Sequence, residues 1–93
     1  KYTEFAYRSN LIGHTGPIND LKYLNNDDLA SCSGDHSIRV WDKFTLDNKF
    51  INNQHNRSCL SLLKLNNGNL VSSSEDKSIK IWSTDLFYNI SIV

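Results

Sequence analysis

One stretch of the sequence, residues 13–42, holds the side chains of a possible catalytic set. His14, Ser31 and Asp35 are the residue types of a base, a nucleophile and an orienting acid, and such triads are recognised by geometry rather than by their order in the chain. Trp41 follows within the same stretch. The first question is whether these residues form a serine hydrolase site or a structural unit.

The same set of residue types occurs again 41 positions further along the chain. Residues 13–42 align without a gap with residues 54–83, and twelve of the thirty aligned pairs are identical. The second set consists of His55, Ser72, Asp76 and Trp82. A hydrolase needs one active site, whereas a repeat architecture needs one structural unit in every repeat. The repetition favours a structural role, and the serines also lack the Gly-x-Ser-x-Gly turn that exposes a nucleophile.

Short runs of β-forming residues, separated by turn residues, make up each repeat. No run has a helical period, so we expect an all-β fold with four antiparallel strands in each repeat. The expected strands cover 18–24, 29–33, 37–41 and about 48–51 in the first repeat, and 59–65, 70–74, 78–82 and about 89–93 in the second. Another strand is expected near 7–12. Apolar residues lie on both faces of the run 37–41, which predicts that each sheet is covered on both sides.

These features resemble two consecutive WD40 repeats. The dipeptides Gly-His at 13–14 and Trp-Asp at 41–42 match the family signature, and the period matches that of a four-stranded propeller blade. The second repeat departs from the signature at Gln54 and Ser83, which flank the shared residues. The resemblance implies that the His, Ser, Asp and Trp of each blade form a buried hydrogen-bonded tetrad. The implied tetrads are His14, Ser31, Asp35 and Trp41, and His55, Ser72, Asp76 and Trp82.

The resemblance also divides the chain into three parts. Residues 1–12 would end a preceding repeat with its outer strand, residues 13–53 would form the first repeat, and residues 54–93 the second. Propellers close about four to eight blades into a ring, so two blades alone would leave two faces bare. We therefore expect a segment of a larger propeller, of seven blades as is commonest in the family. The alternative is a two-blade module that assembles with other copies.

The function that the resemblance implies is a non-catalytic scaffold that binds proteins or peptides through its loops. A catalytic triad of Ser31, His14 and Asp35 remains the alternative from another class. The loop positions expected to meet a partner are Pro17, Asn19, Gly34, Ser58, Leu60 and Glu75. Structural roles compete with this one, because Pro17 could start a strand, Gly34 could supply a positive φ, and Leu60 could belong to the core. Asn19 and Glu75, which are polar, are the preferred candidates.

Charge and hydropathy narrow the classes of partner. Ten Lys and Arg residues balance ten Asp and Glu residues without a basic run, so nucleic acid is not an expected partner. No apolar stretch is long enough to cross a membrane, and the first twenty residues do not resemble a signal peptide. We therefore expect no membrane partner and an intracellular protein, cytoplasmic or nuclear.

The remaining reactive side chains have simple expected roles. Cys32 and Cys59 stand in apolar runs without the CxxC spacing of a metal site, which predicts two buried free thiols in a reducing compartment. His14 and His55 have no further ligands at metal-binding spacing, so we expect no metal and no cofactor. His36 is expected in a solvated turn.

Overall fold

The computed structural model of the chain describes residues 9–83 and, for the backbone alone, residues 88–92. These residues form eight strands in two four-stranded sheets, ordered β1-β2-β3-β4 and β5-β6-β7-β8, and every neighbouring pair is antiparallel. The strands are β1 (Ile18–Tyr23), β2 (Leu29–Ser33), β3 (Ile38–Trp41), β4 (Asn48–Asn52), β5 (Cys59–Lys64), β6 (Leu70–Ser74), β7 (Ile79–Ser83) and β8 (Tyr88–Ile92). The predicted all-β class, with four antiparallel strands in each repeat, is confirmed.

One expected strand differs from the structure. Residues 9–12 belong to no strand, and residues 7–8 lie outside the described residues. A strand persists only when its backbone groups pair with a neighbour. No described strand pairs with residues 9–12, so this segment runs into β1 without forming one.

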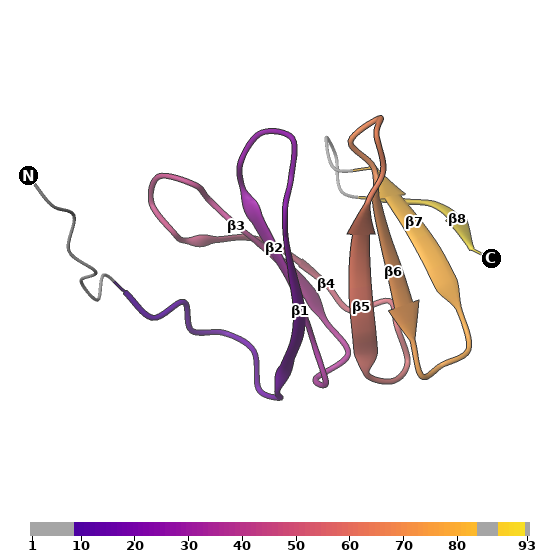
Figure 1. Cartoon of the computed structure of the whole chain (residues 1–93). Coiled ribbons are helices and arrows are strands. Elements are labelled where there is room, and N and C mark those ends of the chain that lie inside the picture. Colours follow the sequence, from indigo (N-terminus) through magenta and orange to yellow (C-terminus); the bar gives the residue numbers. More distant parts are fainter. Residues whose placement is uncertain (1–8, 84–87, 93) are drawn as a thin grey trace, which may run out of the picture.

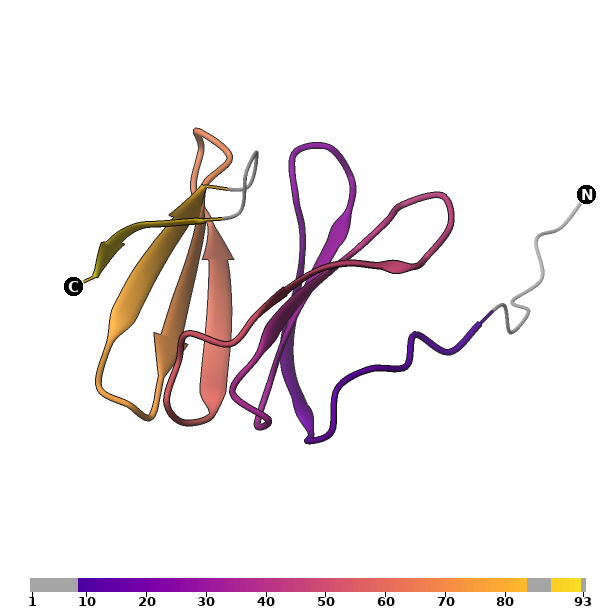
Figure 2. The ribbon, with the colours of Figure 1, turned by 180° about the vertical axis from the view of Figure 1, so that it is seen from behind.

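The two sheets pack face to face, with β5 lying against β1 and β2 (Figures 1 and 2). Since side chains alternate across a strand, every second residue of the first sheet faces the second sheet. The resulting core contains Leu24, Ala30, Cys32, Ile38 and Val40 from the first sheet, and Cys59, Leu62, Leu70 and Trp82 from the second. Among the described residues, no helix is long and apolar enough to cross a membrane.

Tight turns at equivalent positions join the first two strands of each sheet. In the β5–β6 turn, the Gly68 N–H donates to the Leu65 carbonyl oxygen at 2.9 Å. Gly68 has φ = 91°, and its counterpart Asp27 has φ = 70°. A Cβ on Gly68 would lie 2.6 Å from Nδ2 of Asn25, in the corresponding turn of the first sheet. The two turns therefore touch across the interface between the sheets.

We expect Gly68→Ala to lower the free energy of unfolding by about 1 kcal/mol, because an L-residue is strained at this φ. Unfolding in urea measures the loss. The amide of Asn25 can move aside, so Asn25→Ala in the same background should recover only a small part of it. An unchanged unfolding midpoint for Gly68→Ala would show that the turn relaxes freely.

Candidate functional site

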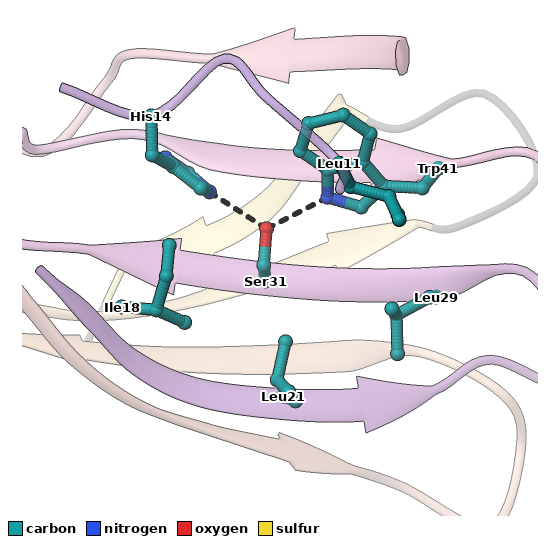
Figure 3. Close-up of a pocket in the computed structure, with 7 residues that line it drawn as sticks. All are labelled: Leu11, His14, Ile18, Leu21, Leu29, Ser31 and Trp41. Carbon is teal, nitrogen blue, oxygen red and sulfur yellow. Dashed lines mark hydrogen bonds between the residues drawn. The ribbon is translucent and has the colours of Figure 1, made fainter. Parts of the chain in front are cut away.

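The tetrad of the first repeat is one continuous chain of hydrogen bonds. Trp41 Nε1 donates to Ser31 Oγ at 2.9 Å, and Ser31 Oγ lies 2.6 Å from His14 Nε2 (Figure 3). His14 Nδ1 lies 2.9 Å from Asp35 Oδ2. When Asp35 is ionised, Nδ1–H donates to it, which leaves Nε2 to accept the Ser31 hydroxyl proton. The chain ties the loop before β1 to β2, to β3 and to the turn between them.

The second repeat builds the same chain. Trp82 Nε1 donates to Ser72 Oγ at 2.8 Å, and Ser72 Oγ lies 2.7 Å from His55 Nε2. His55 Nδ1 lies 2.9 Å from Asp76 Oδ2. In each sheet the imidazole also meets the indole edge-on, with ring centroids 6.3 Å apart. The structure brings together all eight residues that the sequence assigned to the two tetrads, four in each sheet.

In each repeat a fifth side chain joins the tetrad, and the sequence did not predict it. Both the Ser37 hydroxyl and the Ser37 N–H donate to Asp35 Oδ1, at 2.6 and 2.8 Å. Ser78 makes the same two contacts with Asp76. A signal was present, because Ser37 and Ser78 are an identical pair in the repeat alignment, each two residues after its aspartate.

These contacts keep both aspartates ionised. Burial alone would raise the pKa of Asp35, but the hydrogen bonds from Ser37, followed by those from the Thr15 N–H and His14, lower the pKa well below its usual range. For Asp76, burial is likewise outweighed by hydrogen bonds from Ser78 and His55. Each carboxylate is therefore a fixed negative end of its tetrad.

The distances alone would also suit a Ser-His-Asp triad, so burial has to separate the two interpretations. Ser31 is 2% exposed, and Ser72 is fully buried. Each hydroxyl already contacts an imidazole and an indole N–H, whereas a nucleophile must reach a substrate carbonyl. The arrangement favours a structural clamp. Within the described residues, no cluster of three or more His, Cys, Asp or Glu side chains could hold a metal ion.

An apolar pocket of about 300 Å³ opens on the face of the first sheet that points away from the second (Figure 3). Its lining consists of Leu11, His14, Ile18, Leu21, Leu29, Ser31 and Trp41. The equivalent face of the second sheet is covered by the first sheet, so Leu62 on that face is 4% exposed, whereas its counterpart Leu21 is 52% exposed. The pocket therefore lies on a face of the first sheet that no described sheet covers.

The departure at Gln54 has a local explanation. At the equivalent Gly13, a Cβ would lie 2.6 Å from a guanidinium nitrogen of Arg39 and 3.2 Å from Trp41. In the second repeat a lysine, Lys80, replaces this arginine, and its Nζ donates to the Gln54 carbonyl oxygen at 2.8 Å. The side chain at 54 is therefore accommodated because the bulky guanidinium is gone.

Five of the six expected partner positions meet at one edge of the two sheets. The Gly34 N–H donates to the Pro17 carbonyl oxygen at 2.9 Å, and the Glu75 N–H donates to that of Ser58 at 3.0 Å. Asn19 Nδ2 lies 3.3 Å from Ser58 Oγ. The beginnings of β1 and β5 and the turns after β2 and β6 all lie at this edge (Figure 1). We call residues 13–19, 34–36, 54–58 and 75–77 the loop edge.

The expected partner-binding residues differ in the exposure and hydrogen bonding of their side chains. Asn19 Nδ2 also donates to the Cys59 carbonyl oxygen at 2.8 Å, so its amide helps to join the two sheets. Glu75 is exposed, and its carboxylate has no hydrogen bond or ion pair within the described part of the chain. Leu60 is exposed on β5 and does not belong to the core. Glu75 is thus the candidate whose charge is free to meet a partner.

The structural role that competed with partner binding at Gly34, that of the positive-φ residue of its turn, is wrong. That conformation occurs at His36, with φ = 79°, and at its counterpart Lys77, with φ = 73°. Gly34 is instead constrained by space, because a Cβ there would lie 3.1 Å from Pro17 and 3.4 Å from Ser58 Oγ. His36 itself is exposed, in accordance with the sequence prediction.

We expect Asp35→Ala to lower the free energy of unfolding by about 2 kcal/mol, because it leaves His14 Nδ1 and the Ser37 and Thr15 N–H groups without their acceptor. Urea unfolding measures the loss. Asp47→Ala is the matched control, since Asp47 is exposed in the loop between β3 and β4. Equal midpoints for the two variants would contradict a stabilising tetrad.

Acid should also weaken the fold through the tetrads. The folded-state pKa values of Asp35 and Asp76 lie below the unfolded value, which is about 3.9. Their stabilisation is therefore complete above about pH 5 and is lost as the pH falls through the unfolded value towards the folded-state values. Unfolding midpoints measured across this range should fall more steeply for the wild type than for Asp35→Asn. Identical slopes would contradict the assignment to Asp35.

Comparisons with known proteins agree with this geometry. The WD40 family pattern, described as "WD domain, G-beta repeat", matches residues 6–42 and 48–83, which is most of the chain. The crystal structure of the WD40 β-propeller domain of Doa1 is similar over 86% of this chain, with a TM-score of 0.79 and 26% sequence identity. The chain spans 27% of the length of that structure.

No sequence among the curated proteins matches the chain. The family match nevertheless covers both repeats, and the similar structure is a propeller built from such repeats. The two sheets therefore correspond to two adjacent blades of a β-propeller, and the chain belongs to the WD40 repeat family.

Proposed function

We propose that this chain is part of a non-catalytic WD40 scaffold that binds a protein or peptide through the loop edge. WD40 repeats typically serve protein interactions and are usually not catalytic. The observation that carries the proposal is the convergence of loops from both repeats around Ser58, with the free carboxylate of Glu75 beside it. A partner at this edge would contact both blades at once.

The tetrads support this role by holding the loops still. His14 and Thr15 are anchored to Asp35, and His55 and Asn56 are anchored to Asp76 in the same way. Loops held by a rigid frame bind partners with a smaller loss of conformational entropy. The buried polar groups of the tetrads thus hold the loops in place, and the exposed residues beside them bind the partner.

A hydrolase function is the weaker alternative. Ser31 lies in the lining of the apolar pocket, but it is 2% exposed and its hydroxyl oxygen already accepts the Trp41 N–H, which does not favour attack on a substrate. The second tetrad repeats this arrangement under the cover of the first sheet. Two buried copies of one arrangement support a structural role for both.

We also propose that further blades cover the two outer faces, as in a seven-bladed ring. Ile38, on the covered face of the first sheet, is fully buried, whereas its counterpart Ile79 is 45% exposed. The pocket beside Leu21 is the matching gap on the opposite outer face. The additional blades would come from the parent chain or from other copies of this one.

The proposed setting is intracellular, in the cytoplasm or the nucleus. Two free, buried thiols suit a reducing compartment. The balanced charge supports proteins rather than nucleic acid as the partners.

Charge reversal at the loop edge tests the proposed partner site. We expect Glu75→Arg to weaken binding of proteins captured from the native cell at least about tenfold, because a rim charge of the wrong sign repels its partner group. Asp47→Arg is the control, because Asp47 lies in the loop at the opposite end of β3. Quantitative mass spectrometry of the captured proteins measures both. Retention of every partner by Glu75→Arg would reject this surface.

Sedimentation velocity tests the outer faces. We expect the wild-type chain to associate through them, and Leu21→Lys combined with Ile79→Lys to lower its sedimentation coefficient towards that of a monomer. Phe44→Lys is the control, because Phe44 is exposed in the loop between β3 and β4. A folded wild-type monomer would contradict the proposal that these faces are covered.

A further inference from the structure

The two cysteines of the chain lie against each other across the interface between the sheets. Cys32 is on β2 and Cys59 is on β5, and both are fully buried in the common core. The Cys32 thiol donates to the Cys59 carbonyl oxygen, with its sulfur 3.6 Å away. Both residues are free thiols in this structure.

The two thiols also influence each other's ionisation. The neighbouring Cys59 side chain lowers the pKa of Cys32, against the effect of burial. The neighbouring Cys32 side chain raises the pKa of Cys59, and burial raises it further.

The repeat alignment indicates that the fold does not require cysteine at either position. The counterpart of Cys32 in the second repeat is Ser73, and the counterpart of Cys59 in the first repeat is Ile18. Each position therefore accepts another residue in an equivalent sheet. The chain has two cysteines, and both occupy this one juxtaposition.

We propose that Cys32 and Cys59 form a reversible disulfide that joins the two sheets covalently. Bond formation requires the two sulfur atoms to approach to about 2.0 Å, and the contact of the Cys32 sulfur with the Cys59 carbonyl oxygen already places the two residues side by side. The bond would connect β2 to β5 and close the chain segment 33–58 into a loop. It would limit separation of the sheets at the core that they share.

Oxidised glutathione is the oxidant for this step. Cys32 is fully buried between the sheets, so the exchange takes place when the sheets part and expose it. The Cys32 thiolate then attacks one sulfur of glutathione disulfide, breaks its S–S bond and releases one glutathione thiolate, which takes up the proton lost by Cys32. Cys59, on losing its proton, then attacks the Cys32 sulfur of the mixed disulfide. The second glutathione leaves with that proton. The two cysteines lose two electrons in total, and glutathione disulfide is reduced to two molecules of glutathione.

An equilibrium measurement tests the proposal without depending on how fast the buried thiols react. The full chain is equilibrated with defined mixtures of reduced and oxidised glutathione, in native buffer and in denaturing guanidinium chloride. Free thiols are then trapped by alkylation, and mass spectrometry quantifies the intramolecular Cys32–Cys59 bond. We expect the effective concentration of the two thiols to be at least about tenfold higher in native buffer, because folding holds them together. The oxidised chain should also unfold at a higher denaturant concentration than the reduced chain.

Two variants serve as controls for the chemistry. Cys32→Ser and Cys59→Ser each retain one thiol and should form only the mixed disulfide with glutathione, and Cys32→Ser introduces the residue found at the equivalent Ser73. The decisive comparison is between the effective thiol concentrations of the wild-type chain in native buffer and in denaturant. It does not depend on whether either variant folds. An effective concentration that is equal or lower in native buffer, or a bond that links two chains, would overturn the proposal.

Discussion

The rest of this structure depends on the hydrogen bonds made by two buried serine hydroxyls, one in each sheet. Ser31 and Ser72 each accept an indole N–H and contact an imidazole, whose other nitrogen is bound to an ionised aspartate. A buried polar group that loses its partner costs about 1–3 kcal/mol, so all members of such a network must be satisfied together. The network joins the first loop, the second and third strands and the turn of each sheet. It thereby determines where the loop edge stands.

The packing of one sheet on the other imposes the second constraint. Besides its apolar core, the interface contains polar contacts made by neighbouring residues of β1: Asn19 binds the Cys59 carbonyl oxygen, and Asp20 Oδ2 accepts the Leu62 N–H at 2.8 Å. The corresponding residues of the second repeat are Leu60 and Ser61. The second sheet therefore lacks counterparts of the Asn19 amide and the Asp20 carboxylate, which join the two sheets.

Much of the fold was predictable because it is local and repeated. Alternating apolar residues and turn signals located all eight observed strands to within a residue or two, and the resemblance of the repeats to the WD40 family implied both tetrads. Ser37 and Ser78 were missed because their role depends on the direction of a hydroxyl within a turn. The positive φ considered for Gly34 does not occur, because what constrains Gly34 is the space beside Pro17 and Ser58, which are distant in sequence or belong to the other repeat. The expected strand near 7–12 is absent over 9–12 because strand formation needs a partner, which a local pattern does not supply.

The sequence by itself determined the repeat and the all-β class, since these follow from periodicity, and its resemblance to WD40 repeats indicated the residues of both tetrads. Only the tertiary structure decided which of these groups are inaccessible and which loop residues meet. It buried the Ser31 hydroxyl, engaged Asn19 between the sheets, left Glu75 free and set Cys32 against Cys59. The reason is physical: exposure and contact depend on the packing of segments from different repeats, and a sequence pattern within one repeat does not contain that packing.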